Sequence, residues 1–466
     1  MAERFPPFVL RVLRVSLFTV LALSLQLRAD RPDPALSLPD ANFALLRELL
    51  DKALAQSPQM MQRSIALSRA EGDRIAGDSR LLPTVYASGR LSYDNISLSG
   101  SRSTNGTGAY YSLGINQPLY HWGEYSAERE IGRLSERIAQ KAYGEAYRDL
   151  AANVRAQFLR LIIIKRSLAL RAHEVASRER SLREQSARLE AGVGSKSEQG
   201  IAQILFDESS HNLERERFEY EQSRQALARL CGIGSLGDEQ VPAELPAPVL
   251  AANQALELVS FFDQTEGFKA LPSVVSTQHS LRQSELRYHI ASVRLLPKVD
   301  FNASTSLDNQ TFLSNTSLSQ DATRRHTVGL VANWTLFDGL ATRASKRQAL
   351  ADKRDAELRL QNILQGLDDQ KRASVRRFEL AVRGQRLAEE RHERQRAAYN
   401  EARENASQGR ISPNVVDEFM TGMLTTEVQV LTARTEVYSR WNDLVSLLWL
   451  DPALQRLPAH YLNHGN

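Results

Sequence analysis

The sequence has one cysteine in 466 residues, Cys231, and this scarcity excludes two kinds of site. A single thiol forms no intramolecular disulfide and completes no Cys-x-x-Cys zinc or redox motif. Cys231 ends the apolar run QALARLC, which favours a small buried hydrophobic residue over a reactive thiol. We therefore expect no function that depends on cysteine chemistry.

Long apolar runs are absent after residue 29, because none reaches the roughly 18 residues of a membrane-spanning helix. Residues 1–29 place three arginines before the apolar run Val15–Leu27, which is the pattern of a secretory signal peptide. The alternative, a membrane anchor, needs about 20 apolar residues. The sequence thus predicts an exported chain, and any membrane crossing by the mature chain must use β-strands.

A strong charge of one sign is missing as well. The formal net charge is +4, and residues 1–29 contribute +3 through four arginines and one glutamate, which leaves +1 (4 − 3). No basic stripe with interleaved aromatic residues remains, so we expect no nucleic-acid partner. The charged residues, 24% of the chain, instead gather in runs that are typical of long solvated helices.

Catalytic and cofactor motifs are also lacking. We find no Ser/His/Asp or Cys/His arrangement, and no glycine loop for phosphate follows a predicted strand. His460 and His464 have a spacing that could ligate a metal on a helix, but they lie in a polar tail. The sequence predicts no enzyme, no catalytic residue, no cofactor and no metal site.

Two pairs of amphipathic strands are present, and the rest of the chain leads into and out of them. The stretch Leu81–Gly123 reads as two strands around a polar turn, and Leu295–Leu340 repeats this arrangement. The predicted strands cover about 83–95, 109–120, 297–309 and 326–337.

Long charged helices follow each pair of strands. The first is predicted over about 124–190, where apolar residues recur every seven positions as in a coiled-coil seam. Gly192 and Gly194 end it, Ser195 or Ser197 could cap the next helix, and the chain returns over about 196–232. The seam residues are Val154, Leu161, Leu168, Val175, Leu182 and Leu189, with Leu150 and Ile164 between them.

The two halves form a tandem duplication, because matching features keep a constant separation with a single change in the hairpin. The matching pairs are Pro58/Pro272 and Pro83/Pro297 at 214 residues, and Tyr120/Phe337, Gly192/Gly409 and Leu230/Leu447 at 217. The second long helix and its return are then predicted over about 342–406 and 412–450. The predicted organisation is a signal peptide (1–29), a first repeat (30–232), a linker (233–252), a second repeat (253–451) and a tail (452–466).

Each predicted strand alternates apolar and polar side chains over roughly ten residues, as transmembrane barrel strands do. A half-buried soluble sheet shows the same alternation. Charged residues on the polar face and aromatic residues at the helix-proximal strand ends favour the barrel. Four strands cannot close a barrel, so the chain must form an oligomer, and three copies would supply twelve strands. The residues predicted to face the lumen are Arg90, Asp94, Asp300 and Asp308.

The order of motifs resembles that of a known family. Leu82-Pro83 precedes the first strand, QPLY (Gln117–Tyr120) and Gly123 follow the second, and the second copy has WTLFDG (Trp334–Gly339). With the helix turns RLEAGVGSKSE and NASQGRIS, the whole mature chain resembles the TolC-like outer-membrane efflux proteins. That family commonly has Asp-Gly-Gly after the Leu-aromatic pair, where this chain has His121-Trp122-Gly123 and Asp338-Gly339-Leu340.

This resemblance implies a mainly α fold with a small β part. Such a chain forms a homotrimer in which a 12-stranded barrel in outer-membrane lipid continues into a periplasmic α-helical tunnel, with the linker in a mixed equatorial region. It implies the passive exit duct of a tripartite efflux pump or a type I secretion system. The implied partners are a periplasmic adaptor protein and an inner-membrane transporter, and they choose the substrate.

The resemblance also implies a gate and a docking surface at the periplasmic end. Glu198 matches an acidic gate position in the first repeat; in the second, Val415 departs from the pattern and Glu418 matches. An acidic ring would favour cations, but both residues could simply be exposed glutamates in first helical turns. The implied adaptor-docking turns are Gly192, Val193, Gly194, Ser195, Gly409, Arg410, Ile411 and Ser412, and the alternative is a helix reversal without a partner.

Two other classes of protein share part of this pattern. A periplasmic adaptor is exported and rich in coiled coil, but it has one helical hairpin beside many short strands. A structural coiled-coil envelope protein without a channel would not require the alternating strands. Both would leave the membrane without detergent, whereas a barrel would not.

Overall fold

The computed structural model describes residues 38–96, 104–264, 267–314, 317–458 and 461. The predicted signal peptide and both histidines of the tail lie outside these residues. The described chain forms two compact units, one from 38–61, 146–271 and 366–461 and the other from 62–145 and 272–365. Each unit thus contains segments from both halves of the sequence.

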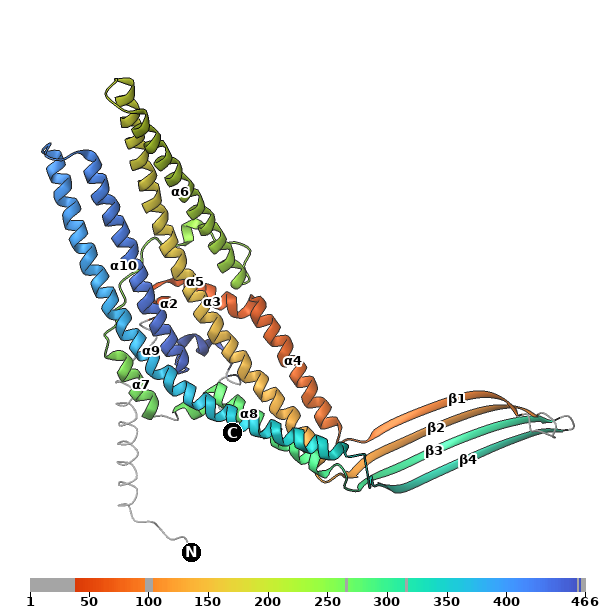
Figure 1. The fold of residues 1–466 in the computed structure, drawn as a ribbon. Helices are drawn as coiled ribbons and strands as arrows, with labels where there is room; N and C mark the ends of the chain where they lie inside the picture. The colour runs from red at the N-terminus through yellow and green to blue at the C-terminus, as the bar shows by residue number, and fades with distance from the viewer. Residues whose placement is uncertain (1–37, 97–103, 265–266, 315–316, 459–460, 462–466) are drawn as a thin grey trace, which may run out of the picture. The chain divides into compact units, whose positions relative to one another are not determined.

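The first unit is helical, and most of it belongs to two helical hairpins, α5–α6 and α9–α10 (Figure 1). Short helices and a 3₁₀ turn, η4, lie at the base of these hairpins. The elements are α2 (Pro39–Asn42), α3 (Ala44–Gln56), α6 (Lys196–Leu230), α7 (Gln254–Gln264), α10 (Pro413–Leu447), η4 (Pro452–Arg456) and the larger parts of α5 (Glu124–Glu190) and α9 (Ala341–Ser407).

The predicted seam of α5 supplies part of the core of the first unit. Leu150, Val154 and Leu161 are fully buried, together with Phe378 and Trp441. Toward the tip the later seam residues, from Val175 on, are only half-buried. Within one chain, the apolar seam is therefore buried near the base of the hairpin and only partly buried at the tip.

The second unit holds a four-stranded antiparallel sheet in the order β1-β2-β3-β4, together with the helices that flank it (Figure 1). Apolar side chains from α5 and α8, among them Ala127, Leu134 and Leu286, form a small helical core. Among the described helices of both units, none has a stretch long and apolar enough to cross a membrane. The elements are α4 (Pro58–Ser79), β1 (Thr84–Ile96), β2 (Thr104–Tyr120), α8 (Pro272–Val293), β3 (Lys298–Ser314), β4 (Ser317–Asn333) and the first turns of α5 and α9.

The register of the two hairpins repeats. Thr84 lies opposite Asn116 and Ile96 opposite Thr104 in the first hairpin. Adding 214 to the first strand and 217 to the second gives Lys298 opposite Asn333 and Gln310 opposite Asp321, and these pairs are present in the second hairpin. The change of offset therefore falls in the connection between Ile96 and Thr104.

The strand bounds differ from the prediction at both ends of the sheet. β2 begins at Thr104 instead of about 109, β3 continues to Ser314 instead of about 309, and β4 covers Ser317–Asn333 instead of about 326–337. The outer ends were missed because their few apolar residues, Phe312, Leu313 and Leu318, do not alternate with polar ones. β4 stops at Asn333 because its partner there, Lys298, follows Pro297, which has no N–H to extend the ladder.

Residues with a left-handed backbone also recur at the offset of the duplication. Gly192 and Gly409 have φ of 74° and 71°, and Gly232 and Trp449 have φ of 72° and 58°. Both pairs are 217 residues apart, and all four residues end a helix. Where glycine is replaced, as at Trp449, a side chain occupies a conformation that costs roughly 1–2 kcal/mol.

Candidate functional site

The sheet has one polar face, on which all four predicted lumen residues lie, Asp300 at its helix-proximal end. Arg90 is opposite Tyr110, which is in turn opposite Asp308, and residues opposite one another in a sheet share a face. The Arg90 guanidinium lies 5.8 Å from the centre of the Tyr110 ring. Asp308 accepts a hydrogen bond of 3.1 Å from Gln310, and Asp94 accepts one of 3.3 Å from Ser92.

Asp300, the fourth predicted lumen residue, has a different environment. Its Oδ1 lies 2.9 Å from Nε2 of His121, and both side chains are largely buried. The cause is an irregularity in β2 between Pro118 and Tyr120, where Pro118 lies opposite Asp300. Asp300 therefore fastens the strand ends to the turn before α5, a contact that strict alternation could not predict.

The opposite face is apolar only along the helix-proximal part of the strands. Val85, Ile115, Ala303 and Val328 share one row across the four strands. Farther out, the row that begins at Tyr93 contains Thr107, Thr311 and Gln320 instead. Leu91, between these rows, is 77% exposed, so none of the described residues covers the band there. Arg324 and His326 also lie on this face, and His326 Nδ1 is 3.0 Å from Thr305 Oγ1.

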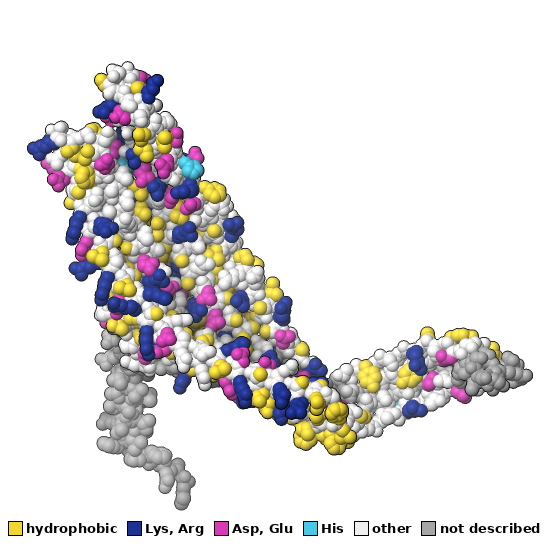
Figure 2. Space-filling view, viewed as in Figure 1, with side chains coloured by type: hydrophobic (Ala, Val, Ile, Leu, Met, Phe, Trp, Pro, Cys, Tyr) yellow, Lys and Arg dark blue, Asp and Glu magenta, His cyan; other side chains and the backbone are white. Residues whose placement is uncertain are grey.

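Exposed apolar residues gather where the strands meet the helices, and we call them the collar (Figure 2). Two tryptophans are fixed there by their indole N–H groups: Trp122 donates to the Pro297 carbonyl at 2.8 Å and Trp334 to the Leu295 carbonyl at 3.1 Å. Phe337 is 75% exposed. The collar consists of Leu119, Tyr120, Trp122, Trp334, Leu336, Phe337 and Leu340.

The two tip turns have closely similar backbones. Val193 donates its N–H to the Arg188 carbonyl at 3.0 Å, and Arg410 donates to the Asn405 carbonyl at 2.9 Å. Gly192 and Gly409 supply the positive φ that this helix ending requires. The turns differ in side chains, since Val193 is apolar and 79% exposed whereas Arg410 is charged.

The two predicted gate glutamates have different surroundings. Glu198 belongs to a capping box: Ser195 Oγ accepts from the Ser197 N–H at 3.1 Å, and a Glu198 carboxylate oxygen accepts from the Ser195 N–H at 3.2 Å. Glu418 is exposed and lines a cavity of about 580 Å³ between α5, α6 and α10. Hydroxyl and amide side chains dominate this cavity, among them Ser177, Ser181 and Asn212.

A row of polar links joins α5 to α10, and sequence reasoning missed it. Arg180 Nη2 is 2.7 Å from Asp417 Oδ2, and Ser177 also donates to Asp417 at 3.4 Å. Nearer the turn, Asn414 donates to a Glu184 carboxylate oxygen at 2.9 Å. The partners are more than 200 positions apart and sit in charge-rich helices, so nothing in the sequence distinguishes them from other charged residues.

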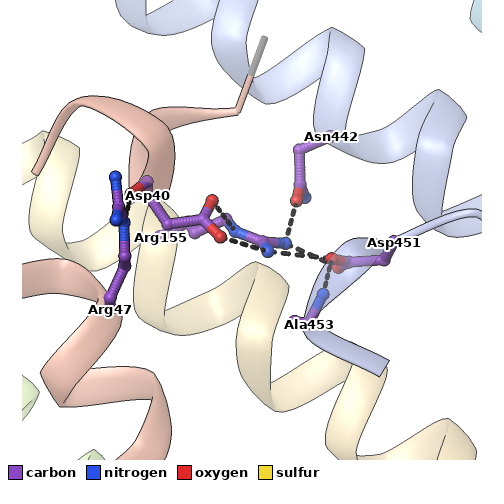
Figure 3. Close-up of polar contacts among 6 residues, drawn as sticks. All are labelled: Asp40, Arg47, Arg155, Asn442, Asp451 and Ala453. Atoms are coloured by element: carbon purple, nitrogen blue, oxygen red, sulfur yellow. Dashed lines mark hydrogen bonds and ion pairs between the residues drawn. The ribbon is translucent and has the colours of Figure 1, made fainter. Parts of the chain in front are cut away.

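A buried ion cluster ties the chain ends to α5 in the first unit (Figure 3). Arg155, which is 2% exposed, donates to Asp40 at 3.0 Å, to Asp451 at 2.6 Å and to Asn442 at 2.8 Å. Asp451 also accepts the N–H of Ala453 at 2.9 Å. The sequence gives no signal for this cluster, because its members come from α2, α5, α10 and the segment after α10.

Metal-binding groups are not assembled in the part of the chain that the structure describes: it contains no group of three or more His, Cys, Asp or Glu side chains placed to hold an ion. Many charged side chains there pair with each other, within one helix as Arg386 with Glu390 or between helices as Arg180 with Asp417. The arrangement can line a passage.

Comparison with known proteins agrees with this geometry. The family model for outer membrane efflux proteins matches residues 49–233 and 270–448, one match in each half of the chain. The chain therefore belongs to the outer membrane efflux protein family. Membership places it in the outer membrane with helices in the periplasm, and assigns it to transport. A search of curated proteins gives no match.

Solved structures share the fold at low sequence identity. The CmeC outer membrane channel of Campylobacter jejuni is 14% identical, with a TM-score of 0.68 over 86% of this chain and 85% of that one. The outer membrane protein VceC of Vibrio cholerae is 14% identical, with a TM-score of 0.67 over 87% and 96%. The open state of the MtrE outer membrane channel of Neisseria gonorrhoeae is 16% identical, with a TM-score of 0.65 over 86% and 88%.

Proposed function

We propose that three copies of this chain form a passive duct through the outer membrane, the exit of a tripartite efflux pump. The observation that carries the proposal is the sheet, which has a charged face, an uncovered apolar band, and two edges, β1 and β4, without a partner strand among the described residues. Unpaired edges are not tolerated in lipid. Pairing β4 of one copy with β1 of the next removes both edges and places the charged face around a wet lumen.

The helical hairpins supply the periplasmic part of the proposed duct. The seam of α5 is only half-buried toward the tip, which leaves apolar surface for a neighbouring copy. The tip turns present Val193 on one hairpin and Arg410 on the other, and we infer that a periplasmic adaptor docks there. An inner-membrane transporter then supplies the energy, because the chain contributes a path and no motor.

Opening of the proposed duct involves the contacts between α5 and α10. The pairs Arg180–Asp417 and Glu184–Asn414 hold the tips of the two hairpins together. The hairpins can separate only if these contacts break. Adaptor binding at the turns would therefore act against the two pairs. Glu198 and Glu418 would add negative charge at the constriction.

The test is membrane retention and conductance of the full-length protein. The mature chain should stay in envelopes washed with carbonate or high salt, migrate as a trimer in mild detergent, and give discrete conductance steps in planar bilayers. Release without detergent would identify an adaptor-like or structural coiled-coil protein and overturn the proposal. Type I secretion is the second candidate, and deletion of the gene separates the two, since loss of drug resistance indicates efflux and loss of a secreted protein indicates secretion.

A further inference from the structure

We propose that a basic patch on the second unit binds the phosphate groups of anionic phospholipids. The inference rests on the proposed embedding of the sheet in the outer membrane and adds a lipid contact to it. The patch consists of Arg287 on α8, Arg294 directly after α8, Lys298 at the start of β3, and Lys346 in the second turn of α9.

Three of these residues line one cavity, and the fourth lies beside it. Arg287, Arg294 and Lys298 line a cavity of about 520 Å³ whose other wall includes Ser345 and Gln348 of α9. Arg294 Nη1 lies 3.4 Å from Ser345 Oγ, and Lys346 Nζ lies 5.7 Å from the centre of the Tyr288 ring on α8. Lys346 of α9 therefore lies against α8, next to Arg287 in that helix.

The patch carries more positive charge than its surroundings neutralise. Lys298 pairs with Glu124, and Asp352 is the second carboxylate that lines the cavity. Within the described residues, Arg287, Arg294, Arg343, Lys346 and Arg347 have no carboxylate at ion-pair distance, whereas the next basic residue of α9, Lys353, pairs with Glu285 and Glu357. Asp338 does not neutralise these cations, because its carboxylate accepts hydrogen bonds from the backbone N–H and the hydroxyl of Thr342.

Helix stability does not explain these cations. The first turns of a helix favour acidic side chains, and the equivalent start of α5 follows that rule with Glu124, Glu128 and Glu130. The start of α9 breaks it with three cations and no acid. Helix-terminus electrostatics therefore does not account for the cations at the start of α9, and we infer that an external anion neutralises the patch.

The collar identifies the anion as a lipid. Leu336, Phe337 and Leu340 are exposed and come directly before α9 in the chain. Figure 2 shows this apolar cluster at the end of the sheet, with basic side chains beside it. A phospholipid can place its acyl chains against the collar and its phosphate on the patch, whereas a free phosphate ion would leave the apolar side chains in water.

The experiment measures which lipids the protein retains. The full-length protein is reconstituted into vesicles of equal parts phosphatidylcholine and phosphatidylglycerol, extracted in mild detergent, and its bound lipids are quantified by mass spectrometry. The unaltered protein should retain phosphatidylglycerol in excess. The triple variant Arg287→Gln, Arg294→Gln, Lys346→Gln should lower that excess at least about tenfold, since each cation near an anionic lipid surface contributes roughly fivefold.

A matched variant controls for net charge. The control removes three exposed cations from the far part of α9, by Arg394→Gln, Arg396→Gln and Arg403→Gln. It should leave the retained lipid unchanged. Equal retention by both triple variants, or full displacement of the lipid by inorganic phosphate at constant ionic strength, overturns the proposal. Release of the unaltered protein by carbonate would instead overturn the membrane channel itself, so the two failures are distinguishable.

Discussion

At the scale of single residues, Arg155 makes the largest set of buried polar contacts in the first unit. Burial alone would lower the pKa of the guanidinium, but the hydrogen bonds and charges of Asp451 and Asp40 outweigh that effect and raise the pKa above its usual value. The arginine thus stays charged at every relevant pH. Its role is to neutralise two carboxylates that fix the segment before α3 and the segment after α10 onto α5.

Arg155→Met should destabilise the first unit by about 3–5 kcal/mol, because it leaves Asp40 and Asp451 buried without a counter-charge. Limited proteolysis and thermal unfolding of the protein in detergent measure the loss. The triple variant Arg155→Met, Asp40→Asn, Asp451→Asn removes the unpaired charges and should recover part of the stability. An equal loss in the single and triple variants would show that packing of the arginine, and not charge, matters.

Cys231 gives a pH-dependent prediction. Burial raises the pKa of its thiol from 9.0 to about 11. The folded state then keeps a proton that the unfolded state loses, so stability should fall as pH rises from about 9 to 11, by about 2–3 kcal/mol at the upper end. Cys231→Ala should lack this part of the pH dependence of unfolding, and maleimide should label Cys231 at pH 8 only after denaturation. Fast labelling of the folded protein would contradict the buried thiol.

At the scale of elements, the tip turns show what sequence spacing predicts well and what it does not. Gly192 and Gly194 were predicted to supply the left-handed backbone that ends the first long helix; Gly192 does so, Gly194 does not, and Gly409 does so in the second repeat. Ser195 caps α6 through a box with Glu198, whereas Ser412 begins α10 without a side-chain cap and relies on Pro413. The role of Glu198 as a cap is thus visible, while its role in a gate stays a prediction.

Glutamine separates these two roles of Glu198. Glu198→Gln keeps an acceptor for the capping box and removes only the charge, whereas Glu198→Ala also removes the cap at about 1 kcal/mol. The pair Glu198→Gln, Glu418→Gln should raise single-channel conductance or weaken divalent-cation block in planar bilayers, because an acidic ring concentrates cations. Unchanged conductance and unchanged block in this variant would remove both residues from the gate.

At the scale of the whole molecule, the duplication predicts how copies of the chain join. Within one chain, β2 of the first repeat pairs with β3 of the second, with Asn116 opposite Asn302. Adding 217 to Asn116 gives Asn333 on β4, and subtracting 214 from Asn302 gives Ser88 on β1. If the barrel closes with the same register throughout, Asn333 of one copy lies opposite Ser88 of the next.

Cysteine cross-linking tests this register. Ser88→Cys with Asn333→Cys, in a Cys231→Ala background, should form an intermolecular disulfide in the trimer, because opposite residues have Cα atoms about 4.5–5.5 Å apart. Ser88→Cys with Thr327→Cys should not, since the same register places Thr327 opposite Asp94. Efficient cross-linking of the control pair would show that the closing strands pair in another register.

The sequence by itself determined the elements and their order. The heptad seam, the paired strands and the 214/217 offsets are local or periodic patterns, and each reflects a backbone requirement that one segment meets alone. Tertiary structure decided which charged residues work together. Arg155 with Asp40 and Asp451, Asp300 with His121, and Arg180 with Asp417 are pairs of residues far apart in a chain rich in charge. An ion pair depends on a few ångströms of separation and on burial, and neither is set until the helices and strands have packed.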